Sequence, residues 1–77
     1  MHTLTFKGNP IEAHQTYQGL EIIITYWQPD KFDIGYYFWY IRNSDLEILA
    51  DNSKNCGCDN LQSAATEARF AIDNLVQ

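Results

Sequence analysis

The sequence predicts an α+β fold, in which a three-stranded or four-stranded antiparallel β-meander carries one C-terminal α-helix packed across one face. Two runs, "LEIIITYW" and "YYFWYIR", are rich in the β-branched and aromatic residues that are typical of strands. The connections after them are short, which favours antiparallel neighbours. Residues 60–77 instead space their apolar positions by three and four, the period of a helix with one buried side.

The 77 residues are enough for one small α+β domain with one core. We expect an N-terminal strand and turn in residues 1–16, the β-meander in residues 17–52, a loop in residues 53–59 and the helix in residues 60–77. A chain of this length buries only about 60–65% of the surface that its unfolded form exposes, so its stability is expected to be small.

The N-terminal segment predicts a short strand in "TLTFK", residues 3–7, followed by a helix start in "NPIE". Asn9 would cap that helix, Pro10 would occupy its first position and Glu12 would reach back to the cap. We therefore expect one or two helical turns before the first long strand.

The alternation of side chains along the strands divides the sheet into two faces. Because an unpaired buried charge is costly, Arg42 assigns its side of the middle strand to the outer face. The predicted core beneath the helix then consists of Leu20, Ile22, Ile24, Tyr37, Trp39, Ile41, Leu46 and Ile48.

The outer face is unusually aromatic for a solvated sheet. Contiguous apolar patches mark interfaces, and Tyr and Trp dominate binding hot spots. The predicted partner-binding residues on this face are Ile23, Trp27, Tyr36, Phe38, Tyr40 and Leu49, with Phe70 on the far side of the helix as a second contact. The alternative is that the N-terminal segment, with Leu4, Phe6 and Ile11, folds back over part of the face.

The charge balance restricts the partners. Ten acidic and five basic residues give a net charge of −5, which repels nucleic-acid phosphates and anionic membranes and favours basic protein surfaces. No run of eighteen apolar residues and no apolar leader is present, so we expect a cytoplasmic protein that does not span a membrane.

The pair "CGC" is the one feature of the sequence that suggests chemistry. Cys56 and Cys58 could both bind one soft metal ion, but tetrahedral zinc needs four ligands and a lone Cys-x-Cys is not a zinc signature. Ordinary loop cysteines explain the pair better, and we expect no cofactor, no metal and no catalytic residue.

These observations together predict a small acidic, non-enzymatic protein-binding module that acts through its aromatic sheet face and self-associates as a homodimer. Three alternatives stay open. The chain could be an acidic inhibitor, of the kind that phages and mobile elements encode, which occupies a basic nucleic-acid-binding site of another protein. It could bind single-stranded nucleic acid by base stacking, or it could carry a thiol or metal site at Cys56 and Cys58.

Overall fold

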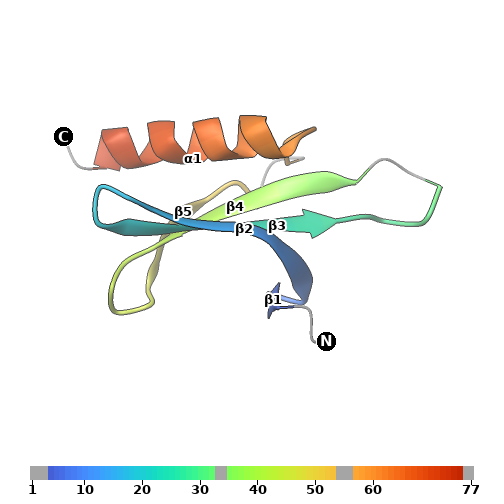
Figure 1. The fold of residues 1–77 in the computed structure, drawn as a ribbon, viewed down its shortest axis with the longest axis horizontal. Helices are drawn as coiled ribbons and strands as arrows, with labels where there is room; N and C mark the ends of the chain where they lie inside the picture. The colour runs from blue at the N-terminus through green and yellow to red at the C-terminus, as the bar shows by residue number, and fades with distance from the viewer. Residues whose placement is uncertain (1–3, 33–34, 54–56, 76–77) are drawn as a thin grey trace.

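The protein is a curled five-stranded antiparallel sheet with one helix across one face (Figure 1). The computed structural model describes residues 4–32, 35–53 and 57–75. The strands follow one another in the sheet in chain order. The elements are β1 (Thr5–Phe6), β2 (Asn9–Tyr17), β3 (Leu20–Trp27), β4 (Tyr36–Arg42), β5 (Ile48–Asp51) and α1 (Leu61–Leu75). The predicted α+β class with an antiparallel sheet and a C-terminal helix is confirmed, whereas the predicted count of three or four strands is wrong.

The additional strand is β2, and it replaces the helix start predicted at "NPIE". Two tight turns enclose this segment, and each has two consecutive residues with positive φ. Lys7 and Gly8 have φ of 54° and 84°, and Gln18 and Gly19 have φ of 51° and 80°. Such pairs form the two-residue hairpin turns whose twist matches that of the flanking strands. Because both ends of the segment are hairpins, it must run extended, and the capping pattern is overridden.

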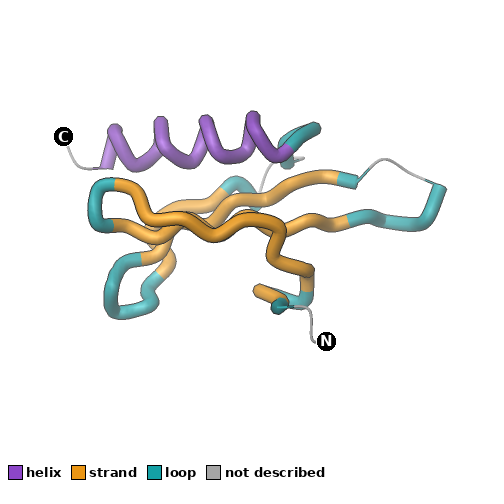
Figure 2. Tube along the Cα trace, in the orientation of Figure 1, coloured by secondary structure: helices purple, strands orange, loops and turns teal. Residues whose placement is uncertain are grey.

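The side chains of β2 alternate as a strand requires. Ala13, Gln15 and Tyr17 are partly buried, while their neighbours are exposed. An irregularity in the pairing with β3 lies between Ile11 and Ala13. Such bulges bend a strand and increase its twist. The start of β2 therefore turns away from the sheet and carries β1 to the side opposite α1 (Figure 2).

The main core lies between α1 and the sheet. Ile22 and Ile24 of β3 face Ile41 and Trp39 of β4 in register, and all four are buried. The helix contributes Ala64, Ala68 and Ile72, which are fully buried. The small alanine side chains let the helix backbone approach the sheet closely, as the helical spacing in the sequence indicates.

The predicted core position of Leu46 is wrong. This side chain is 66% exposed, and the residue has a positive φ of 66°. The turn after β4 is longer than expected because Asn43 closes it: its side-chain oxygen accepts hydrogen bonds from the backbone N–H groups of Asp45 (2.9 Å) and Glu47 (3.0 Å). β5 therefore begins only at Ile48.

The helix packing predicts a strong effect of charge at Ala68. Ala68→Asp places a carboxylate at a fully buried position against the sheet, which should reduce the free energy of unfolding by about 3–5 kcal/mol. Thr66→Asp introduces the same group at an exposed position of the same helix and should change it by less than about 0.5 kcal/mol. Urea unfolding followed by circular dichroism measures both, and equal stability of the two variants would contradict the packing.

Candidate functional site

The outer face of the sheet, opposite α1, is divided into a covered half and an open half. In the covered half the ring of Phe6 stacks on that of Tyr40, with centroids 4.9 Å apart. Ile23, Thr25 and Tyr40 are buried beneath this cover. The alternative that the N-terminal segment folds back over the face therefore holds for this half through Phe6, whereas Leu4 is 73% exposed. Ile23 and Tyr40 lie on the predicted face, but they are not displayed on its surface.

The cover is fixed by charged groups at its border. The Arg42 guanidinium lies 5.5 Å from the centre of the Phe6 ring and donates a hydrogen bond from Nε to Glu21 Oε1. His14 Nε2 lies 2.6 Å from the other carboxylate oxygen of Glu21. The hydrogen bond from Arg42, assisted by His14, holds the pKa of Glu21 below its usual value although partial burial opposes this shift. Arg42 thus lies on the outer face, as the sequence predicts. Its guanidinium is bonded to Glu21 and lies over the Phe6 ring.

The open half carries the rings of Trp27, Tyr36 and Phe38. Trp27 pairs with Tyr36 across the two strands, and its ring centroid lies 6.3 Å from that of Tyr36 and 6.2 Å from that of Phe38. Trp27 is 41% exposed, and the other two rings are partly buried. Trp27 ends β3 and Tyr36 begins β4, so the cluster lies at that end of the β3–β4 ribbon. We call these three residues the open aromatic cluster.

A groove of about 220 Å³ lies beside the cluster. Its lining consists of Asn9, Trp27, Phe38, Tyr40 and Ser53. On the rim, the backbone N–H and the hydroxyl of Ser53 both donate hydrogen bonds to Asp51 Oδ1, at 2.9 and 2.6 Å. Burial raises the pKa of Tyr40, and the charge of Asp51 raises it further. The groove therefore has an aromatic floor, and the carboxylate of Asp51 lies next to its lining residue Ser53.

The glycine of "CGC", Gly57, packs against β4, the strand that carries Tyr36 and Phe38. Gly57 has a φ of +84°, and a side chain there would begin 3.0 Å from Tyr36 Cβ and 3.2 Å from Phe38 Cε1. Close approach of backbone to rings, and a left-handed conformation, both favour glycine at this position. The structure thus gives Gly57 a packing role.

Cys58 is a buried structural residue. Its backbone exchanges two hydrogen bonds of 2.9 Å with Tyr37, and the Asn52 side-chain amide lies 3.7 Å from its sulfur. Burial, with a further contribution from nearby Glu67, raises the pKa of the Cys58 thiol to about 11. A thiol that stays protonated at neutral pH is a poor nucleophile and a poor metal ligand. Cys56 lies outside the described residues.

No cluster of three or more His, Cys, Asp or Glu side chains able to hold a metal ion occurs in residues 4–32, 35–53 and 57–75. The same residues contain no helix that is long and apolar enough to cross a membrane.

Phe70 does not join the open aromatic cluster, because the sheet separates them. It is 68% exposed and lines a hollow of about 390 Å³ on the helix side, together with Trp39 and Glu67. The Trp39 indole N–H donates a 3.3 Å hydrogen bond to Glu67 Oε1 there. Leu49, on the edge strand β5, is 39% exposed.

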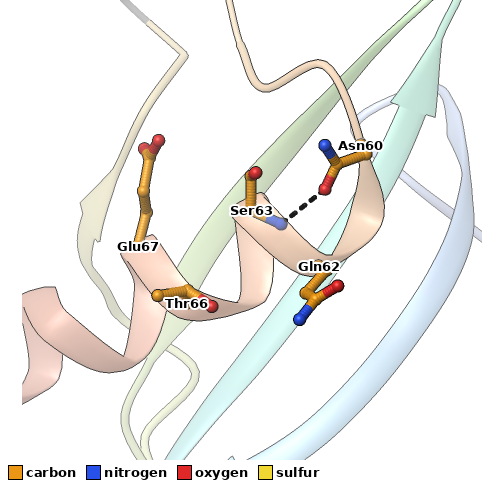
Figure 3. Close-up of a pocket in the computed structure, with 5 residues that line it drawn as sticks. All are labelled: Asn60, Gln62, Ser63, Thr66 and Glu67. Carbon is orange, nitrogen blue, oxygen red and sulfur yellow. Dashed lines mark hydrogen bonds between the residues drawn. The ribbon is translucent and has the colours of Figure 1, made fainter.

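A polar hollow of about 360 Å³ lies at the start of α1 (Figure 3). Asn60 caps the helix here, since its side-chain oxygen accepts a 2.7 Å hydrogen bond from the backbone N–H of Ser63. Although this hollow is larger than the aromatic groove, its lining of Asn60, Gln62, Ser63, Thr66 and Glu67 contains no ring. The cap uses one of the helix-end donors that would otherwise attract an anion.

Sequence reasoning did not identify Asn9 and Ser53 as parts of the groove. Asn9 was assigned to a helix cap, and Ser53 to an unspecified loop. The available signal was the pair of two-residue turns ending in glycine at positions 8 and 19, which predicts a hairpin on either side of the "NPIE" segment.

Comparison of the chain with protein-family models, with curated proteins and with solved structures gave no match.

The burial of Cys58 predicts a pH dependence of stability. Because its folded pKa lies near 11, above the ordinary value of 9.0, the unfolded thiol loses its proton first as the pH rises. This contribution to stability is complete below pH 9 and is lost between pH 9 and 11, with a slope of up to about 1.4 kcal/mol per pH unit.

Urea unfolding of the parent and of Cys58→Ala across this pH range isolates the effect, because all other titrating groups are common to both proteins. The parent should lose more stability than the variant between pH 9 and 11. Parallel curves for the two proteins would show that the thiol is not buried.

Proposed function

We propose that the chain is a non-enzymatic protein-binding module whose contact surface is the open aromatic cluster. The observation that carries the proposal is the incomplete cover of the outer face. Phe6 covers Tyr40 and its neighbours, yet Trp27 remains 41% exposed with two rings in contact with it. Surface patches of this composition are typical of protein interfaces, where Trp and Tyr contribute most of the affinity.

The chemistry of the described residues supports binding rather than catalysis. Cys58 is buried with a raised pKa and is engaged by the sheet edge. His14 is held by Glu21, which is itself bound by Arg42. Neither side chain has the arrangement of nucleophile, base and orienting group on which nucleophilic catalysis depends.

The proposed partner is a protein. The sequence predicts that the two meet in the cytoplasm. A second copy of the chain is one partner, since two open aromatic clusters could face each other across a two-fold axis. Homodimers of this kind should be visible by light scattering after size-exclusion chromatography. The net charge of −5 opposes self-association and favours a basic partner.

A second candidate function is inhibition of another protein by occupying its basic nucleic-acid-binding site. The observation that favours it is the position of Asp51 beside the aromatic groove, because rings next to carboxylates are suited to arginine-rich surfaces. Competition between this chain and nucleic acid for a common partner would distinguish inhibition from simple binding.

The proposal predicts opposite behaviour of two tryptophans. Trp39→Ala removes a core side chain and should cost about 3–5 kcal/mol, enough to unfold so small a domain. Trp27→Ala and Phe38→Ala should cost less than half as much, because both rings stand at the open surface. These two variants should instead weaken association by about 2 kcal/mol or more, as expected for central interface aromatics.

Phe70→Ala provides the matched control, since it removes an exposed aromatic from the opposite side of the sheet. The immobilised parent and variants are compared for the proteins that they retain from the native source, and light scattering measures self-association. Retention lost with Phe70→Ala but kept with Trp27→Ala would move the interface to the helix side and refute the proposal.

A further inference from the structure

The groove between Asn9 and Ser53 has features of a specific subsite within the aromatic surface. Its floor is formed by Trp27, Phe38 and Tyr40. The rings of Trp27 and Phe38 are inclined by 59° with centroids 6.2 Å apart, so they form two sides of a corner rather than a flat stack. Because the two rings contact each other, a group in the groove would lie against both sides of this corner rather than between the rings.

The size of the groove limits what it can take. Pockets for cofactors and drug-sized ligands commonly measure about 300–1,000 Å³. The groove measures about 220 Å³ and is open to the surface through Trp27. It therefore suits one side chain of a protein rather than a complete small-molecule ligand.

The polar atoms around the groove favour a donor-rich group. Asp51 is adjacent to the groove, because its carboxylate accepts two hydrogen bonds from Ser53, which lines it. Asp51 pairs with Tyr40 of the floor across β4 and β5. The side chains of Asn9 and Ser53 contribute further oxygen atoms to the lining. Aromatic faces combined with nearby oxygen acceptors are the surroundings in which cations bind to proteins.

The chain already holds its own cations on rings of this type. Arg42 lies over Phe6 at 5.5 Å, and Lys31 lies over Phe32 at 5.1 Å. Arg42 is bonded to Glu21 and lies over Phe6, neither of which lines the groove. Phosphate-bearing ligands are disfavoured by the net charge of −5 and by Asp51.

We propose that this groove receives one cationic side chain, arginine or lysine, from the partner protein. The inference rests on the proposed protein-binding function and specifies the chemistry of the contact. The aliphatic stem would pack against the corner formed by Trp27 and Phe38, and the negative charge of Asp51 next to Ser53 would attract the cationic head.

The test uses the full chain, labelled with ¹⁵N, and the probe N-acetyl-arginine N-methylamide. The matched neutral probe is N-acetyl-citrulline N-methylamide, which has the same length without the charge. The indole N–H signal of Trp27 reports on the groove. That of Trp39 serves as an internal reference, because it is directed to Glu67 on the helix side. Trp27→Phe assigns the two signals.

The arginine probe should shift the Trp27 signal saturably, with a millimolar dissociation constant, and should leave the Trp39 signal in place. The citrulline probe should bind at least about fivefold more weakly. Equal binding of both probes, or absence of a shift at Trp27, would overturn the inference. So would tighter binding of thymidine monophosphate, which would identify the groove as a base-stacking site.

A pair of charge variants separates the groove from the general field of the protein. Asp51→Asn retains an acceptor for Ser53 and removes the charge, and it should weaken arginine binding about threefold at low salt. Asp45→Asn removes one charge from the exposed turn before β5 and should change binding by less than about 1.5-fold. Equal effects of the two variants would show that only net charge matters and would contradict the subsite.

The results also distinguish this inference from the proposed function. If the arginine probe fails while Trp27→Ala still abolishes partner retention, the surface binds protein by other chemistry and only the inference falls. If the probe binds while Trp27→Ala retains its partners normally, the groove is a cation site but the proposed interface is wrong.

Discussion

The pairing of β3 with β4 determines the rest of the structure, because it creates a ribbon that is apolar on both sides. Its register places Ile22, Ile24 and Trp39 on one face and Ile23, Tyr40 and Phe38 on the other. Each face requires a cover, and the chain supplies two. Helix α1 covers the core of the first, whereas the two-residue strand β1 covers only part of the second. The rings of the open aromatic cluster lie at the end of the ribbon, on the part of the outer face that β1 does not cover.

The edge of β4 shows how the fold satisfies its backbone without another full strand. β5 pairs only with the C-terminal end of β4. Beyond β5, the side-chain oxygen of Asn52 accepts a 2.8 Å hydrogen bond from the backbone N–H of Trp39. The backbone of Cys58 exchanges two hydrogen bonds with that of Tyr37. Buried backbone groups are costly when they lack partners. Gly57 and Cys58 are therefore explained by close packing and hydrogen bonding against β4. Gly57 lies next to the rings of the aromatic surface.

The central ribbon, the helix and their shared core could be predicted because period-two and helical patterns are strong in these segments. The N-terminal half of the sheet was missed since Asn9, Pro10 and Glu12 satisfy the rules of a helix start, and only the turns on both sides show otherwise. Leu46 was misplaced because alternation was extended through a turn that Asn43 lengthens. The outer face was predicted by composition, but its division into covered and open halves depends on the bend of β2, which alternation does not encode.

The acidic composition and the open rings are best understood together. An exposed aromatic surface on a small domain favours non-specific association, and a net charge of −5 opposes it by repulsion between copies. In the proposed function the same charge is complementary to a basic partner, so one property would both discourage self-contact and direct the rings to that partner. Asp51 brings this general effect close to the rings, because its carboxylate is bonded to Ser53, which lines the groove together with Trp27 and Phe38. Selectivity would then come from the one place where charge and aromatic surface meet, while the remainder of the cluster supplies contact area.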